Sequence, residues 1–390
     1  MEHTHKISSF VFAISSLFLV FLSCTKEPLS NLNSRYKTES LTIKKDGFIN
    51  KLDTNEYEIK VEASLSLPDK STILSCSRLK YDDGHFFLQS EGKNQTIWVF
   101  DSIGHFVTKL GERGRSRNEY QTDITDWFYI NSTDEVVVFE KNSKKIHVFA
   151  LDGSKPESFI LQSWPNAIGV LDRGRIFCSY YQREAKEGMQ LALLSENEDV
   201  VSPFIFLGHD MEFVPSDKSF YKIKEQLFHI PCFADSAIVF RSDTVEKIVK
   251  LKFEDDFITE ELKEKAYKDN LENYNNFNGI KYVSEYYETS EYNIIRFLCE
   301  QVYINQIINK KNDKQYRFIS ALPRGIFPST VFCVRDDKIY YLITKENVEE
   351  IRILLEKEAL EKQMKISSSI IKDIFNDKIQ LPAIVSIKIK

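Results

Sequence analysis

The residues best suited to binding chemistry lie in one short segment, residues 111–120, which carries arginines at alternate positions. Arg113, Arg115 and Arg117 gather positive charge in a chain whose formal net charge is −6. Guanidinium groups form paired, charge-assisted hydrogen bonds with carboxylates, so this cluster could hold a carboxylate or an acidic glycan. The alternative is a solvated turn in which Arg115 pairs with Glu119, since exposed ion pairs are common and weak. The predicted binding residues are Arg113, Arg115, Arg117, Glu119 and Tyr120.

No enzyme or metal-site motif accompanies this segment. The sequence contains no G-x-S-x-G, no phosphate-binding loop and no H-E-x-x-H, and its histidines are scattered. The six cysteines show no C-x-x-C pair and no metal-ligand spacing. Five of them have apolar neighbours and are interpreted as buried free thiols, although an oxidising compartment would also permit a disulfide. We therefore predict neither a metal nor a cofactor, and the sequence leans towards a protein that is not an enzyme.

The N-terminus has the layout of an export signal. A short polar start ends at Lys6, and residues 10–22 are apolar apart from Ser15 and Ser16. At about 1.5 Å per residue this run reaches roughly 20 Å as a helix, short of the ~30 Å core of a bilayer. A signal peptide fits this length better than a permanent membrane span.

The end of the apolar run resembles a bacterial lipobox, the signal for lipoprotein processing. The small Ser23 precedes Cys24, and Phe21 stands where such sequences usually have leucine. The resemblance implies that residues 1–23 are removed and that Cys24 becomes the lipidated first residue. Several acyl chains anchor a protein stably, whereas a single chain is marginal. The alternative is an ordinary secretory signal with an incidental cysteine. Residues 24–55 are polar and predict a tether between the membrane and the folded domain.

Composition places the rest of the chain among strand-rich folded proteins. Hydrophobic residues make up 42% and aromatic residues 13% of the sequence. Aromatic side chains pack well on a pleated surface, so this surplus favours strands. The acidic net charge argues against a nucleic-acid partner, because phosphate binding needs a basic face.

From residue 56 onward, short apolar runs recur in clusters. Ile97–Phe100 and Ile146–Phe149 are one repeat apart, and each is followed by a turn that contains glycine. A repeat of about 40–50 residues with several strands is typical of a propeller blade, which must stack on neighbours to bury its faces. Six such clusters fit residues 56–390 and predict an all-β, six-bladed β-propeller. We expect Tyr57–Val61 and the C-terminal strand to share one blade and close the ring.

Two helical insertions interrupt the strand pattern. Thr259 is suited to cap a helix that begins with two glutamates and carries an apolar stripe through Leu262. A second helix is expected over Glu346–Lys365. Stripes of this kind usually pack on the host domain, so both helices are predicted to be small additions to the propeller.

The arginine segment also carries a family resemblance. Residues 111–120 resemble the loop G-x-x-G-R-G-P-G-E-Y of the six-bladed β-propeller lipoproteins of Bacteroidetes, which are related to NHL-repeat propellers. Ile97–Gly104 resembles the NHL-type strand and turn, and residues 377–385 are similar to the closing strand of that family. Residues 116–118 depart from the family loop, because Ser, Arg and Asn replace Gly, Pro and Gly. The resemblance implies a lipid-anchored, six-bladed propeller.

These patterns lead to one favoured function and two alternatives. The favoured interpretation is a binding or protein-interaction module held at the bacterial envelope, because the loops on a rigid ring suit binding. Its expected partners are the membrane, through the lipid anchor, and an unknown protein or glycan ligand. One alternative is a propeller lyase or hydrolase acting on a glycan or peptide, with its residues around the central axis. The other is a structural subunit of an envelope complex, docked through the helical insertions.

Overall fold

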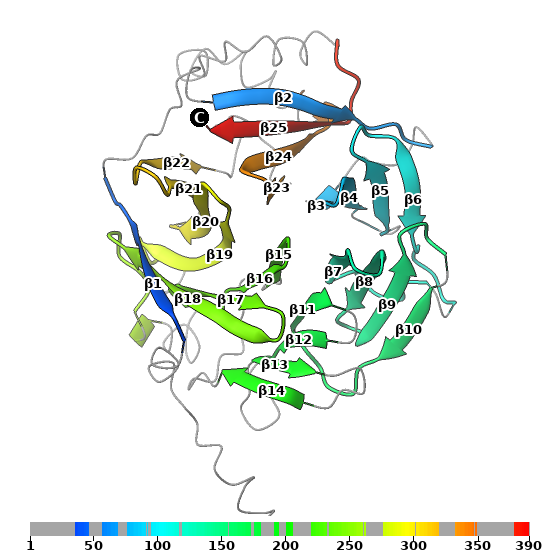
Figure 1. Cartoon of the computed structure of the whole chain (residues 1–390), viewed down its shortest axis with the longest axis horizontal. Coiled ribbons are helices and arrows are strands. Elements are labelled where there is room, and N and C mark those ends of the chain that lie inside the picture. The colour runs from blue at the N-terminus through cyan, green and yellow to red at the C-terminus, as the bar shows by residue number, and fades with distance from the viewer. Residues whose placement is uncertain are drawn as a thin grey trace, which may run out of the picture.

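The computed structural model arranges its strands in six sheets around a central axis (Figure 1). It describes residues 36–46, 57–68, 76–90, 92, 95–116, 119–154, 156–172, 175–180, 191–194, 200–205, 220–231, 234–259, 261–262, 276–300, 302–319, 332–346, 348 and 378–389. Neighbouring strands within each blade are antiparallel, apart from one parallel pair in blade 4. The prediction of an all-β, six-bladed propeller is therefore confirmed.

Each blade follows the chain from an innermost strand outwards. Blade 1 contains β3 (Cys76–Asp82), β4 (His85–Ser90), β5 (Ile97–Asp101) and β6 (Phe106–Leu110). Blade 2 contains β7 (Asp126–Ile130), β8 (Glu135–Glu140), β9 (Lys145–Ala150) and β10 (Glu157–Ile160). Blade 3 contains β11 (Ala167–Asp172), β12 (Arg175–Ser179), β13 (Leu191–Leu194) and β14 (Val200–Ile205).

The other three blades include the strands that come from both ends of the chain. Blade 4 contains β15 (Phe220–Ile223), β16 (Gln226–His229), β17 (Ser236–Arg241), β18 (Thr244–Phe253) and β1 (Thr38–Ile43). Blade 5 contains β19 (Ile280–Glu288), β20 (Tyr292–Cys299), β21 (Val302–Asn309) and β22 (Gln315–Ile319). Blade 6 contains β23 (Phe332–Arg335), β24 (Lys338–Ile343), β25 (Ala383–Ile389) and β2 (Tyr57–Ser64).

The middle strands of a blade are apolar on both faces because each blade is covered by its neighbours. In β5, residues Ile97–Phe100 are all buried, and the same holds for most of β8. Phe87 of blade 1 stacks against Trp127 of blade 2 with ring centroids 5.5 Å apart. Aromatic pairs of this kind add to the burial of apolar surface between blades. The surplus of aromatic residues thus supplies the contacts between sheets.

The two chain termini of the propeller meet in blade 6, as predicted. β2 pairs antiparallel with β25, with Tyr57 opposite Ile389 and Ser64 opposite Ala383. β25 in turn pairs with β24, so the outermost strand of the last blade comes from the start of the domain. The chain then passes to blade 1, where Gly104 (φ 93°) approaches so closely that a Cβ would lie 2.4 Å from the Ser64 carbonyl oxygen. Ring closure therefore depends on backbone contacts at both ends of β2.

A buried carboxylate joins three strands of this closing blade. Glu62 of β2 accepts hydrogen bonds from Lys338 Nζ of β24 (2.7 Å) and Ser386 Oγ of β25 (2.6 Å), and from Lys60 Nζ (2.9 Å). Burial opposes ionisation of Glu62, but the hydrogen bonds from Lys338, Ser386 and Lys60 outweigh it and lower its pKa to about 2. Glu62 is therefore ionised in the folded protein at any pH above this value.

We expect Glu62 to make the stability of the ring sensitive to acid. Its folded pKa lies below the ordinary value of 4.5, so its contribution is fully present above pH 4.5 and is lost as pH falls towards 2. At 1.36 kcal/mol per pKa unit, the full loss is about 3 kcal/mol, of which about 2 kcal/mol has occurred by pH 3. Urea unfolding at pH 7 and at pH 3 should show this partial loss for the natural protein and a smaller one for Glu62→Gln. Equal losses in both proteins would contradict the assignment.

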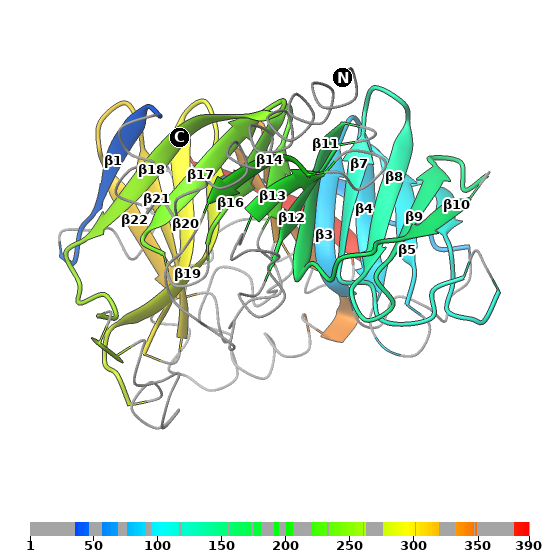
Figure 2. The ribbon, with the colours of Figure 1, turned by 90° about the horizontal axis from the view of Figure 1, so that it is seen from below.

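Part of the predicted tether is instead a strand. Thr38–Ile43 form β1, which pairs in parallel with β18 on the outer edge of blade 4, as the side view shows (Figure 2). Every second side chain of β1, at Glu39, Leu41 and Ile43, is at least partly buried, and Ile43 is fully buried. Gln315 of blade 5 fixes β1 further, because its amide donates to the Thr42 carbonyl (2.9 Å) and its oxygen accepts from Lys44 N (3.1 Å). The expected tether therefore cannot extend through residues 38–43.

The predicted helices lie almost wholly outside the described residues. Thr259 Oγ1 accepts a hydrogen bond from Leu262 N (3.3 Å), as expected of a helix cap, and Val348 is buried. Within the described ranges, no helix is long and apolar enough to cross a membrane. The predicted signal peptide over residues 1–23 and the predicted lipidation site Cys24 also fall outside the described ranges.

No disulfide joins the cysteines that the structure describes. Cys178 and Cys333 are buried as predicted, whereas Cys76 and Cys299 are only partly covered. Burial raises the pKa of the Cys333 thiol far above its usual range, which keeps it protonated. These thiols pack as small apolar groups in the sheets.

Candidate functional site

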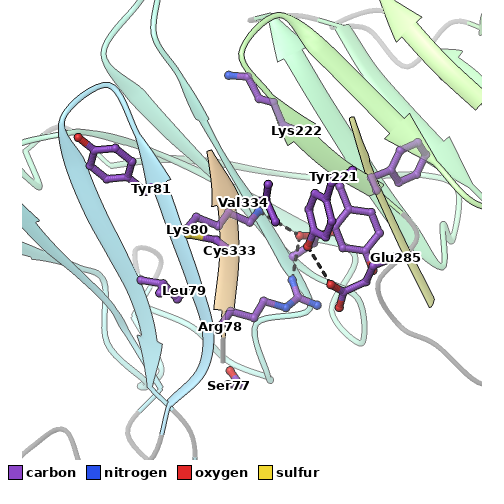
Figure 3. Close-up of a pocket in the computed structure, with 13 residues that line it drawn as sticks. Ser77, Arg78, Leu79, Lys80, Tyr81, Tyr221, Lys222, Glu285, Cys333 and Val334 are labelled. Carbon is purple, nitrogen blue, oxygen red and sulfur yellow. Dashed lines mark hydrogen bonds and ion pairs between the residues drawn. The ribbon is translucent and has the colours of Figure 1, made fainter. Parts of the chain in front are cut away.

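The innermost strands of blades 1, 2, 4, 5 and 6 enclose a cavity of about 70 Å³ on the ring axis, which we call the axial cavity (Figure 3). Its polar lining includes Ser77, Arg78, Lys80, Asp126, Tyr221, Lys222 and Glu285. In Figure 3, Arg78 and Lys80 extend from β3 towards Tyr221 and Glu285 on the opposite side. Five blades therefore bring titratable side chains to one place.

The polar lining follows from the alternation of side chains along β3. Residues two apart in a strand face the same side of the sheet. Arg78, Lys80 and Asp82 share that spacing, and all three make ion pairs with groups from other blades. This alternation of charged residues was the signal in the sequence for a strand that faces a polar axis, and our sequence analysis missed it.

We call the cluster of Arg78, Asp126 and Lys80 the loop-side triad, because it lies where the innermost strands begin after the interblade loops. Arg78 Nη1 lies 2.8 Å and Lys80 Nζ 3.7 Å from Asp126 Oδ1. The Lys80 ammonium also donates to the Trp127 carbonyl oxygen and sits 4.2 Å from the centroid of the Trp127 ring. The Asp126 side chain is only 2% exposed, so this one carboxylate is paired with both Arg78 and Lys80 inside the ring.

A second cluster, the hairpin-side triad, occupies the other end of the axis, where the innermost strands end at hairpins. Arg335 Nη1 lies 2.8 Å and Lys222 Nζ 3.8 Å from the Asp82 carboxylate. Burial lowers the pKa of Lys222, and Arg335 lowers it further, although Asp82 opposes the shift. Lys222 also donates to the Tyr129 carbonyl oxygen, so this ammonium joins blades 1, 2 and 4.

Blade 5 contributes a carboxylate held by its own neighbours. Glu285 accepts from the Tyr287 hydroxyl (2.9 Å) and pairs with Arg296 Nη1 (3.3 Å). The Tyr221 hydroxyl donates to the Ser284 carbonyl oxygen (2.7 Å). Burial raises the pKa of both tyrosines well above the usual value, so their hydroxyls remain protonated donors.

A larger hollow of about 470 Å³, the face pocket, opens among the hairpins of blades 4, 5 and 6. Its lining is mostly polar and includes Lys224, Glu225, Arg241, Glu288, Ser290 and Asp337. Lys224 pairs with Asp336 (2.9 Å), and Arg241 pairs with Glu246 (3.1 Å). Lys247 and Lys310, each 2.8 Å away, hold the pKa of Glu288 below its usual range, although burial opposes this. The face pocket therefore presents fixed charges of both signs.

The predicted binding loop joins β6 to β7, on the face of the ring opposite the face pocket. Arg113 is exposed and pairs with Asp123 (2.8 Å), Arg115 is exposed, and Glu119 accepts from Ser116 N (2.8 Å). Tyr120 is fully buried and its hydroxyl donates to the Leu110 carbonyl oxygen (2.7 Å), so its side chain holds the loop in place. Arg117 lies outside the described residues, and the loop as a binding surface stays a prediction.

The loop rests on a buried histidine. His147 Nε2 lies 2.6 Å from Glu140 Oε1, with both side chains inaccessible, and the Tyr120 ring packs edge-on against His147 at 5.2 Å. His147 is thus part of the packing beneath the loop. Over the described ranges, no three His, Cys, Asp or Glu side chains gather in a way that could hold a metal ion.

Comparison with one solved structure agrees with the fold. A candidate exported protein of Bacteroides fragilis is similar with a TM-score of 0.73 and 14% identity, over 90% of this chain and 99% of that one. A member of the DUF4221 family from Bacteroides vulgatus matches with a TM-score of 0.48 and 12% identity, over 87% and 100%. No curated protein sequence matches the chain. The model of a domain of unknown function, DUF4934, matches residues 69–375, which is most of the propeller. The chain therefore belongs to the DUF4934 family.

Proposed function

We propose that this chain is an exported, lipid-anchored β-propeller that acts as a binding module at the bacterial envelope. The lipobox-like residues before Cys24 support export and anchoring. The structural similarity to a candidate exported protein of Bacteroides fragilis is in keeping with this location. The resemblance of the arginine loop, residues 111–120, to the loop of NHL-related propeller lipoproteins also supports this proposal.

The observation that carries the binding role is the face pocket. Small-molecule sites commonly occupy about 300–1,000 Å³, and the face pocket, at about 470 Å³, falls in that range. Hairpins of three blades hold its charged groups in defined ion pairs, so the pocket is preorganised rather than formed on binding. A polar ligand that complements both signs of charge fits this lining.

Filling the face pocket should abolish binding without unfolding the ring. Glu225 is 86% exposed and makes only a long contact (3.6 Å) with Arg241, so Glu225→Trp introduces a bulky side chain at low cost to stability. We expect a thermal-shift screen of amino acids, dipeptides and disaccharides to yield a compound that raises the Tm of the natural protein. That compound should not stabilise Glu225→Trp.

Glu112→Trp is the matched control, because Glu112 is also exposed and weakly paired but lies in the loop on the opposite face. The control should respond like the natural protein. If no compound shifts the Tm, or if every shift persists in Glu225→Trp, the face pocket is not the binding site.

Replacement of Cys24 by serine should abolish lipid attachment. A serine cannot form the thioether through which a lipoprotein cysteine is acylated, so labelled palmitate should no longer be incorporated into the chain. Ser23→Ala is the control, because alanine keeps the small residue before the cysteine and should retain the label. Mass spectrometry of the N-terminal peptide provides a second measurement. Persistent palmitate on Cys24→Ser would disprove lipidation at this residue.

The convergence of Asp126, Glu285, Tyr221 and Tyr287 at the axis favours a second candidate, an axial lyase or hydrolase acting on a glycan or peptide. The carboxylates and tyrosines supply the residue types used for general acid and base catalysis. Glycan or peptide cleavage that is lost in Glu285→Gln, while the fold is retained, would establish this alternative.

A further inference from the structure

The axial cavity contains polar atoms that the described part of the chain leaves unsatisfied. Asp126 Oδ2 and Ser77 Oγ are buried and have no hydrogen-bond partner among the residues that the structure describes, and both residues line this cavity. The ion pairs with Arg78 and Lys80 and the hydrogen bond from Trp127 N all involve the other carboxylate oxygen, Asp126 Oδ1. A buried carboxylate oxygen without a donor costs free energy, so the cavity calls for a group that donates to Asp126 Oδ2.

The surrounding charges restrict the chemistry of that group. A fully deprotonated anion cannot donate a hydrogen bond to a carboxylate, and any anion would be repelled by Asp126 and Glu285. A cation would meet Arg78 and Lys80, which already lie within 3.7 Å of the Asp126 carboxylate. A neutral hydroxyl satisfies both requirements, because it gives its proton to the carboxylate and offers lone pairs to the neighbouring cations.

The size of the cavity restricts the ligand further. At about 70 Å³ it has roughly half the volume of the ~150 Å³ cavity that accommodates benzene in an engineered protein core. A complete sugar ring does not fit, whereas a hydroxymethyl group or a pair of adjacent hydroxyls does. The Lys80 side chain is 29% exposed, so the cavity is not sealed from solvent. The aromatic rings of Tyr81, Phe220 and Tyr221 supply apolar walls for the attached carbon atoms.

We propose that the axial cavity is a hydroxyl-recognition site that takes the hydroxyl-bearing tip of a polyol. Asp126 Oδ2 is the acceptor, Arg78 and Lys80 are the donors, and Ser77 Oγ is a secondary partner. The tip belongs either to a free polyol or to the terminal group of a glycan. This site is distinct from the face pocket and goes beyond the proposed binding function, so either proposal can fail while the other stands.

Saturation-transfer NMR on the full chain in detergent tests the proposal, with glycerol as the free-polyol probe and methyl α-glucopyranoside as the glycan-tip probe. We expect at least one probe to bind. Glycerol binding identifies a free-polyol site, and binding of the glycoside alone identifies a glycan tip. Asp126→Asn should weaken binding about tenfold or more, because it removes a charge-assisted hydrogen bond. Ser77→Ala should weaken binding severalfold. Because this replacement removes no ion pair, it provides a second test of the site if the Asp126→Asn protein does not fold.

Two controls separate this site from its surroundings. Asp82→Asn changes the equivalent carboxylate of the hairpin-side triad. Asp82 itself does not line the cavity, although its partner Lys222 does, so the affinity should stay nearly unchanged and should fall far less than in Asp126→Asn. Glu225→Trp blocks the face pocket and should also leave it unchanged. If neither probe binds, so that the cavity holds water alone, the proposal is overturned. Binding that survives in both Asp126→Asn and Ser77→Ala, or that is lost only in Glu225→Trp, overturns it as well.

Discussion

Replacing Val385 with aspartate is expected to open the propeller ring and to destabilise the protein by about 4 kcal/mol or more. Val385 lies at the centre of β25, opposite Val61 on one side and Tyr341 on the other, and is fully buried. The substitution loses about 2 kcal/mol of apolar burial and buries a carboxylate that has no partner. Typical domains are stable by only 5–15 kcal/mol, so this loss removes much of the margin.

The expected measurement is a fall in Tm of about 6 °C or more, or loss of the folded protein altogether. Lys388→Asp provides the control, because Lys388 lies in the same strand but its side chain is exposed. Its Tm should change little. A stable Val385→Asp protein with intact blades would mean that the pairing of β2 with β25 contributes little to the ring.

Two arginine–aspartate pairs of equal length are expected to differ severalfold in their effect on stability. Arg78 Nη1 to Asp126 Oδ1 and Arg113 Nη1 to Asp123 Oδ1 both measure 2.8 Å. The first pair is buried, with side chains 10% and 2% exposed, whereas the second is 39% and 64% exposed. We expect Asp126→Ala to cost about 3–5 kcal/mol, because it leaves Arg78 and Lys80 inside the ring without their carboxylate. Asp123→Ala should cost less than about 1 kcal/mol, because water solvates the guanidinium that remains.

Urea unfolding of both variants measures the difference directly. The double replacement Arg78→Met, Asp126→Leu should recover part of the stability lost in Asp126→Ala, since apolar residues of similar size often replace a buried ion pair at little cost. Similar losses for Asp126→Ala and Asp123→Ala would show that the loop-side triad is solvated. No recovery in the double replacement would indicate that packing, and not charge, sets the cost.

The three candidate binding sites lie in separate parts of the ring, one on each face and one on the axis. The arginine loop lies on the face where the innermost strands begin, and the face pocket lies where they end. The axial cavity lies between them; the loop-side triad lines it, and so does Lys222 of the hairpin-side triad. Variants of Glu225, Asp126 and the loop therefore test different sites without shared contacts, which makes their effects separable.

The sequence by itself determined the blades and the way in which the ring closes. Strand formation depends on residue type and on short apolar runs, both of which are local, so Ile97–Phe100 and Ile146–Phe149 could be identified as strands directly. The closing pair of Tyr57–Val61 with the C-terminal strand followed because a propeller ring usually closes by placing its first and last strands in one blade. The buried Cys178 and Cys333 followed from their apolar neighbours in the same way.

Only the tertiary structure decided the role of β1 and the content of the axis. Thr38–Ile43 are polar enough to resemble a tether, and their strand pairing depends on β18, more than two hundred residues away. Arg78, Lys80 and Asp82 alternate within one strand, but Asp126 and Lys222 reach them from other blades. No local pattern encodes such a meeting, because the partners are set by the angles at which the blades stack. The physical reason is that strands form from nearby residues, whereas a polar axis is formed by charges that are distant in sequence and become partners only when the ring closes.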